Sequence, residues 1–166
     1  MRYLYILLFI ALCGNILAQN SSHKTYGVDG YNAGVTMLEA ANNTFFLLGN
    51  STGNANNAGI FLAKTNSNGS LIWQNIYGSS NIDHAEDMLL LPDSTLLITG
   101  YTNNTNNGIY NILLLAINTQ GEQLWRKQIN NPNWCFAYKM NITADTNILL
   151  VGELFNENTQ NDMFFA

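Results

Sequence analysis

The sequence contains little charge, and least of the positive sign. Charged residues make up 10% of the chain, with 6 Lys and Arg against 11 Asp and Glu, and the formal net charge is −5. Phosphate backbones and anionic membrane surfaces are bound by clustered positive charge, and here Arg126-Lys127 is the one adjacent basic pair. We therefore expect no nucleic-acid partner and no binding to an anionic membrane surface.

The apolar run at the N-terminus is too short to span a membrane, which takes about 20 residues. It extends from Tyr3 to Leu12, follows Arg2, and is succeeded by a small residue, Ala18. This is the layout of a secretory signal peptide. We predict a signal peptide over 1–18 and a mature chain over 19–166 that is secreted or held at the cell surface, without inserting into the membrane.

Cysteine is scarce, with 2 in the chain. Cys13 lies in the predicted signal peptide, and its use as an acylated lipoprotein cysteine is disfavoured because Leu12 stands where a small residue is expected. Removal of the signal leaves Cys135 alone, so the mature chain cannot form an intramolecular disulfide. Its stability must come from packed apolar surface.

Hydrophobic residues make up 47% of the chain, too many for a disordered protein, which combines low hydrophobicity with high net charge. The chain also lacks the Ala-, Glu-, Lys- and Leu-rich bias of long-helix proteins. Its polar residues are mostly Asn, Thr, Ser and Gly, placed between short apolar runs. Turn-forming residues in that arrangement favour β-structure.

Segments of the chain match one another at a fixed offset. Three apolar runs end on Gly49, Gly100 and Gly152, which are 51 and 52 residues apart. Other positions agree in the same register: Gly34, Ala85 and Ala137; Met37, Met88 and Met140; Gly69 and Gly121; and Trp73 and Trp125. The sequence therefore predicts just under three repeats of about 52 residues, over about 27–77, 78–129 and 130–166.

Each repeat contains four short strand candidates. In the second repeat they are Asp87–Leu91, Thr95–Tyr101, Ile109–Ile117 and Gln123–Ile129. Gly69 and Gly121 suit tight hairpins because glycine takes a positive φ without steric cost. Strands joined so closely must be antiparallel, so each repeat is predicted to be a four-stranded meander.

The second strand of the first repeat is apolar on both faces, since Phe45 and Leu47 point one way and Phe46 and Leu48 the other. Burial on both sides requires a neighbouring sheet on each side, and radial stacking of such sheets makes a β-propeller. We predict an all-β fold: an incomplete, β-propeller-like array of four-stranded antiparallel blades.

The recurring Trp73 and Trp125 are expected at the seam between blades, where a large ring with one polar N–H suits a partly wet edge. Stacking of these rings on sugar is the alternative.

The order of these features is similar to the repeats of secreted bacterial β-propellers. Each unit has a small residue, Met or Val, an apolar run, Gly, a polar loop and a second apolar run. The first two units continue with Asn-x-x-Gly-x-x-x-Trp, which the third lacks, and Tyr77-Gly78 follows the first copy. The resemblance covers about residues 26–166. It implies a large extracellular bacterial protein, often exported through a type IX C-terminal sorting domain. The acidic residue that often precedes the third strand is present as Asp162, replaced by Asn111, and absent at Gly59.

The third repeat stops at Ala166, inside its third strand. Three units do not close a ring, and the outer blade faces would expose apolar surface. We expect the chain to be a fragment, or to be completed by the remaining blades of a longer chain or by other subunits.

The densest polar cluster is Asp83, His84, Glu86 and Asp87. Oxygen-rich clusters can hold Ca²⁺, but in an extended chain Asp83 and Asp87 face away from His84 and Glu86. A solvated strand entrance is therefore favoured over a metal site.

Catalytic residues are not indicated. Cys135 and His84 occupy near-equivalent points of successive repeats, about 10 Å apart if the sheets stack, too far for a thiol–imidazole pair. Asp87 and Glu153 could be imagined as the two carboxylates of a glycosidase, but nothing in their spacing singles them out. We expect no cofactor.

The favoured function is a non-enzymatic extracellular module that binds carbohydrate or protein at the blade ends, or serves as a scaffold within a larger surface protein. The alternative is the propeller portion of a secreted carbohydrate-active enzyme whose catalytic residues lie mostly outside this chain.

Overall fold

The computed structural model describes residues 23–53, 59–79, 82–103, 108–158 and 160–166. The predicted signal peptide, 1–18, lies outside these residues. The described chain is all-β, as predicted: it forms eleven strands and one short 3₁₀ helix, η1 (Ala41–Asn43).

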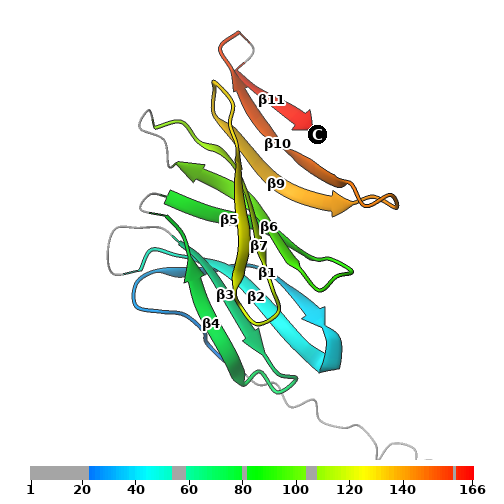
Figure 1. Cartoon of the computed structure of the whole chain (residues 1–166). Coiled ribbons are helices and arrows are strands. Elements are labelled where there is room, and N and C mark those ends of the chain that lie inside the picture. The colour runs from blue at the N-terminus through cyan, green and yellow to red at the C-terminus, as the bar shows by residue number, and fades with distance from the viewer. Residues whose placement is uncertain (1–22, 54–58, 80–81, 104–107, 159) are drawn as a thin grey trace, which may run out of the picture.

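The strands form three antiparallel sheets, named sheets A, B and C in chain order (Figure 1). Sheet A contains β1 (Asn32–Ala40), β2 (Thr44–Ser51), β3 (Gly59–Thr65) and β4 (Leu71–Tyr77). Sheet B contains β5 (Ile82–Leu90), β6 (Leu96–Asn103), β7 (Asn111–Ile117) and β8 (Gln123–Ile129). Sheet C contains β9 (Cys135–Ile142), β10 (Ile148–Asn156) and β11 (Gln160–Phe165).

Strands that follow one another in the sequence are hydrogen-bonded neighbours in every sheet. Sheets A and B are therefore four-stranded meanders, as the turn chemistry predicts, and sheet C is a three-stranded one. The β3–β4 and β7–β8 turns are built alike. The side-chain oxygens of Asn66 and Asn118 each accept two backbone N–H groups of their own turn. Gly69 and Gly121 take φ values of 69° and 90°, which a side chain would disfavour.

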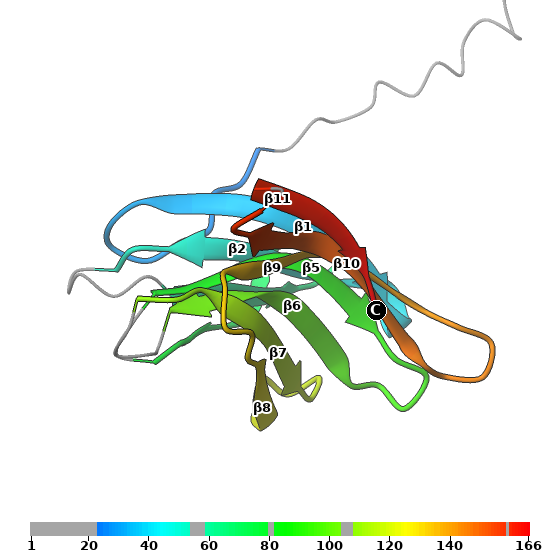
Figure 2. The ribbon, with the colours of Figure 1, turned by 90° about the horizontal axis from the view of Figure 1, so that it is seen from above.

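The three sheets lie in layers, with sheet B between sheets A and C (Figure 1). They overlie one another in the view from above (Figure 2). Leu97 and Ile98 are neighbours on β6 and are both fully buried, but on opposite sides. Ile98 packs in the cluster that includes Phe46 of sheet A, and Leu97 in the cluster that includes Leu150 of sheet C. Each such burial contributes about 1.5–3 kcal/mol to stability.

The first strands of the sheets lie in a row, since β1 contacts β5 and β5 contacts β9. In each of them the ladder skips one residue, at a corresponding place in the strand: Val35 in β1, Glu86 in β5 and Tyr138 in β9. These β-bulges bend the strand and redirect the side chains next to it.

The bulges explain the recurring glycines of the second strands. A Cβ atom added to Gly49 would lie 2.6 Å from the carbonyl oxygen of Ala33. At Gly100 and Gly152 it would collide with the carbonyl oxygens of His84 and Phe136. The backbone just before each bulge therefore approaches the second strand too closely for any residue but glycine.

Most predicted strand boundaries of the second repeat agree with the structure to within two residues, but one differs by more. β5 begins at Ile82, five positions before the predicted start at Asp87. The cluster from Asp83 to Asp87 thus lies within the strand, and Asp83 is fully buried, so the solvated strand entrance was wrong. This polar segment can form part of the β5 strand because neighbouring groups compensate its charges.

Candidate functional site

The four polar residues of the predicted cluster point in different directions. His84 and Glu86 pair with each other, with Nδ1 and Oε1 3.3 Å apart. Asp83 and Asp87 make separate contacts on other strands. Within the described residues, no three His, Cys, Asp or Glu side chains are grouped closely enough to hold a metal ion.

Asp83 forms an internal ion pair with Arg126 of β8 at 2.5 Å. The guanidinium also donates to the Thr102 hydroxyl at 3.1 Å, and the carboxylate accepts the backbone N–H of Ser79. The charge of Asp83 is thus compensated inside the fold, and Arg126 is engaged within the protein.

Asp87 joins sheet B to sheet C. Its carboxylate accepts the backbone N–H of Met140 at 3.1 Å and lies 3.4 Å from the ammonium group of Lys139, both on β9. Glu153, its imagined catalytic partner, instead contacts Tyr138 and Asn161. The two carboxylates therefore serve different contacts rather than facing one another across a common site.

Asn50 of β2 joins sheet A to sheet B. Its side-chain amide donates to the carbonyl oxygen of Ala85 at 2.9 Å and accepts the Ala85 N–H at 2.7 Å. The same amide nitrogen lies 3.1 Å from Nε2 of His84. Burial lowers the pKa of His84, although the neighbouring Glu86 acts in the opposite direction.

Cys135 is a buried thiol at the start of β9. Its sulfur lies 3.8 Å from the carbonyl oxygen of Ile129, and burial raises its pKa. A thiol held in its neutral form is a poor nucleophile. His84 instead contacts Asn50 and Glu86, so among the described residues its imidazole is engaged away from the Cys135 thiol.

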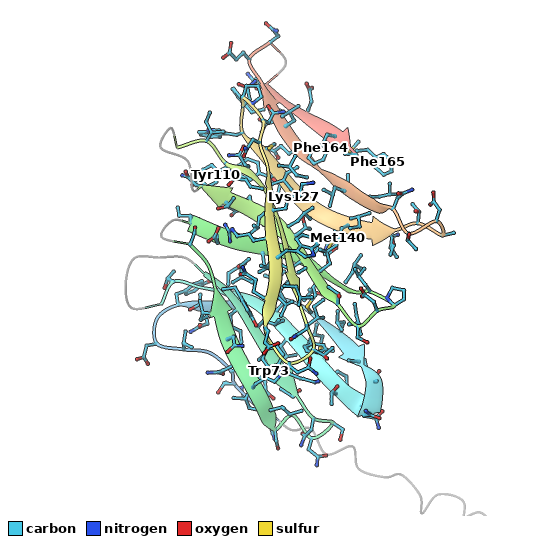
Figure 3. The ribbon with its side chains drawn as sticks, in the orientation of Figure 1. Trp73, Tyr110, Lys127, Met140, Phe164 and Phe165 are labelled. Carbon is cyan, nitrogen blue, oxygen red and sulfur yellow. The ribbon has the colours of Figure 1, made fainter. Side chains whose placement is uncertain are left out.

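Trp73 and Trp125 lie in different surroundings. Trp73 packs against Phe46 with ring centroids 5.9 Å apart, and its N–H donates to the carbonyl oxygen of Thr119, in the β7–β8 turn, at 3.3 Å. It therefore lies in the seam between sheets A and B (Figure 3). The equivalent Trp125 on β8 is 43% exposed.

The structure also groups a set of rings that the sequence analysis did not single out. This aromatic cluster lies where sheets B and C meet, at the end of the stack that carries the β6–β7, β8–β9 and β10–β11 loops. Its members are His84, Tyr101, Tyr110, Trp134, Phe136, Tyr138 and Phe155.

The rings form a connected series. His84 stacks on Tyr101 with centroids 4.7 Å apart. Tyr101 meets the edges of Tyr110 and Phe136 at 5.6 and 5.0 Å, and Tyr110 meets Trp134 edge-on at 5.8 Å. Edge-to-face pairs of this kind add about 0.5–1.5 kcal/mol each beyond the area they bury. The series therefore ties the two sheets together and also holds its outer members in place.

The outermost rings of the cluster are open to solvent. Trp134 is 48% exposed and Phe155 is 37% exposed. Together with Ile109, Pro132 and Asn133 they line a hollow of about 390 Å³. Tyr110, the residue just before β7, packs against Trp134 at this corner of the molecule (Figure 3).

At the other side of the cluster, Tyr138 donates a hydrogen bond to Glu153 at 3.1 Å. Partial burial, together with the carboxylates of Glu153 and Glu86, raises the pKa of Tyr138 to about 12. The phenol is therefore protonated and acts as a hydrogen-bond donor at any physiological pH.

A signal for this cluster was present in the sequence. Trp134, Phe136 and Tyr138 alternate along one segment, and alternate residues of a strand share a face. The contribution of Tyr101, Tyr110 and Phe155 depends on how sheets B and C stack, which no local pattern encodes.

The chain matches no protein-family model, and no curated protein is significantly similar to it in sequence. Among the residues that the structure describes, no helix has the length and hydrophobicity needed to cross a membrane.

Proposed function

We propose that the chain is a non-enzymatic, secreted repeat module: part of a β-propeller-like stack that serves as a binding and scaffold unit of a larger extracellular or cell-surface bacterial protein. In this proposal each sheet is one blade, the row of first strands lies innermost, and further sheets of the same kind cover the outer faces of sheets A and C. These further sheets come from the remaining chain or from other subunits.

One observation carries the proposal. Met88 and Met140 occupy the same repeat position in sheets B and C, and both are buried, at 5% and 7% exposure. Met37 occupies that position in sheet A and is 67% exposed. A methionine that is a core residue in two units and a surface residue in the third suggests an unfilled seam.

The surroundings of Met37 support this interpretation. It borders a hollow of about 390 Å³ whose lining includes Leu47 and Phe61. Their counterparts in sheet B, Ile98 and Leu113, are fully buried in the seam with sheet A. Large exposed apolar patches of this kind mark interaction surfaces.

The opposite end of the stack is similar. On sheet C, Met163 is 85% exposed and Phe165 is 72% exposed. Phe164, between them, points inward and packs against the cluster shared with sheet B (Figure 3). The stack thus presents one apolar outer face at each end. The outer face of sheet A corresponds to the face of sheet B that packs against sheet A, and the outer face of sheet C to the face of sheet B that packs against sheet C.

The two acidic side chains Asp83 and Asp87 are held in structural contacts, which supports the non-enzymatic part of the proposal. Asp83 pairs with Arg126, and Asp87 holds the backbone of β9. Both carboxylates thus have structural partners, which favours a scaffold over a catalytic role.

Complementary face variants test the proposal. We expect the purified protein to associate beyond the mass of a single chain of 18.4 kDa, because one copy's sheet A face can meet another's sheet C face. Met37→Glu and Phe165→Glu should each shift the protein toward monomer in multi-angle light scattering, since a charge in a buried seam is costly. An equimolar mixture should form one-to-one pairs, because one intact face of each kind remains.

Gln120→Glu, at an exposed turn position, is the matched control and should leave association unchanged. A monodisperse wild-type monomer with a sharp melting transition would contradict the proposal. So would single-face variants that associate as the wild type does.

Secretion is tested separately. Expression in a bacterium with an intact export pathway should yield a mature protein beginning at Gln19, as judged by intact mass, because a small residue at Ala18 suits signal peptidase. Retention of the full-length chain in the cytoplasm would contradict this part.

A further inference from the structure

We propose that the hollow at the loop end of the seam between sheets B and C binds a neutral sugar residue of a glycan. This inference rests on the proposed binding role and assigns it a site and a ligand class. The hollow is lined by Ile109, Pro132, Asn133, Trp134 and Phe155.

The walls of the hollow have the chemistry that a sugar ring requires. Trp134 and Phe155 are both open to solvent, and their ring centroids lie 6.2 Å apart with planes inclined at 44°. The C–H faces of a pyranose are apolar and stack on aromatic rings, while its hydroxyl groups point sideways into water or onto polar groups. Two inclined rings at this spacing can contact one sugar on a face and an edge, and Asn133 is the one residue of the lining with a polar amide side chain.

The rings are held in position without a ligand. The backbone oxygen of Trp134 accepts the N–H of Phe155 at 2.8 Å, which joins the residue before β9 to the end of β10. Tyr110 supports the Trp134 ring edge-on, and its own carbonyl oxygen accepts the N–H of Cys135 at 2.9 Å. A site that is already ordered loses little conformational entropy when it binds.

The loop that carries Trp134 is likewise fastened. The backbone N–H of Asn131 donates to the side chain of Asn111 at 3.1 Å, and the N–H of Asn133 donates to the side chain of Asn131 at 3.0 Å. Asn111 is almost fully buried, so the loop is anchored to the interior of sheet B rather than to its own surface.

The size and charge of the hollow select the ligand. Its volume of about 390 Å³ falls in the range of small-molecule sites, which are mostly apolar with a few polar groups. None of the five lining residues is charged, so the site offers no partner to a phosphate, a uronate or a basic peptide. A neutral hexose or pentose unit fits this chemistry best.

The experiment is a titration of the purified protein with neutral hexasaccharides, namely cellohexaose, maltohexaose, mannohexaose and xylohexaose, followed by calorimetry and tryptophan fluorescence. We expect saturable binding of at least one of them. Trp134→Ala should weaken it by about tenfold or more, as truncation of an aromatic anchor does. Phe155→Ala should weaken it as well.

Trp125→Ala is the matched control, because Trp125 is similarly exposed but lies on β8, outside the hollow. It should leave the affinity unchanged within about twofold. Far-UV circular dichroism checks the fold of each variant. Asn133→Ala removes the amide side chain of one lining residue and leaves both rings in place, so it keeps the test valid if Trp134→Ala fails to fold.

Absence of binding to every hexasaccharide, or equal losses in Trp125→Ala and Trp134→Ala, would overturn the inference. Binding of a proline-rich peptide in the hollow instead of a sugar would overturn it too. The single-face variants Met37→Glu and Phe165→Glu should still bind the sugar, because their substitutions lie outside the hollow. Failure of sugar binding is therefore distinguishable from failure of the stacking proposal.

Discussion

Asp83 illustrates how a low-charge sequence uses the few charges it has. The side chain is fully buried, a position that an aspartate occupies rarely unless it is paired. Arg126 supplies the pairing charge from the other edge of sheet B, and Ser79 and Thr102 supply hydrogen bonds to the pair. The pair therefore acts as an internal cross-link of sheet B.

Asp83→Ala should destabilise the protein by about 3 kcal/mol, because removal of one member leaves the other charge buried and uncompensated. The double variant Asp83→Ala, Arg126→Met should recover part of the loss. Urea unfolding followed by circular dichroism measures both. Glu39→Ala, at an exposed position of β1, serves as control, and an Asp83→Ala variant as stable as that control would show that the pair contributes nothing.

His84 should make stability depend on pH. Burial holds its pKa below the ordinary value of 6.5, so the unfolded chain takes up the proton first as the pH falls. Stability is then complete above about pH 6.5 and decreases as the pH falls toward the folded-state pKa.

His84→Gln should flatten the stability profile between about pH 7 and pH 5, where histidine titrates. Thermal melts across that range measure the effect. His23 is the other of the 2 histidines and is exposed, so His23→Gln should keep the wild-type slope. A slope unaffected by His84→Gln would assign the pH dependence to the carboxylates instead.

The first two strands of each sheet form one structural element with a shared bulge. The skipped residues Val35, Glu86 and Tyr138 differ in chemistry, so the bulge is determined by the backbone and not by one side chain. Because the backbone forms the bulge, the skipped side chain can differ from sheet to sheet and make different contacts. Glu86 contacts His84, whereas Tyr138 contacts Glu153.

Gly100→Ala should destabilise the protein by about 2 kcal/mol or more, because the new methyl group meets the His84 carbonyl oxygen. Gly34→Ala is the matched control. No atom lies within 4 Å of a Cβ atom at Gly34, and alanine already occupies the equivalent positions 85 and 137.

The control should therefore be neutral, or stabilising by up to about 1 kcal/mol. Chemical denaturation compares the two variants. Equal stabilities would contradict the close approach at the bulge.

Of the three sheets in the described part of the chain, sheet B is the one that has another sheet packed against each of its two faces. Every residue of β7 is buried, whereas β4 and β8 are mostly exposed or half-buried. Stability should therefore be concentrated in the middle of the stack and lowest at its outer edges.

Hydrogen exchange measured by mass spectrometry should show this gradient. We expect the slowest exchange in peptides covering β6 and β7, and faster exchange in peptides covering β4 and β11, because opening an outer strand exposes less apolar surface. Uniform protection across the three sheets would indicate that the stack unfolds as a single unit. Fast exchange in β7 would contradict the layered core.

Much of the fold followed from local patterns. The hairpin glycines Gly69 and Gly121, the apolar second strands and the meander order rest on turn chemistry and on the alternation of side chains, which act between neighbouring residues. The start of β5 did not, because the burial of Asp83 depends on Arg126, which is 43 positions away. The tryptophans differ for a similar reason, since Trp73 is covered by Thr119 of the β7–β8 turn while Trp125 is exposed.

The sequence by itself determined that the chain forms all-β, antiparallel meanders with apolar residues on both faces, because strand and turn preferences are properties of short segments. Only the tertiary structure decided which polar groups are buried, where the bulges lie and how Trp134 and Phe155 come to line a common hollow. Those features arise from contacts between residues that are distant in the chain, and such contacts are set by how whole sheets pack against one another.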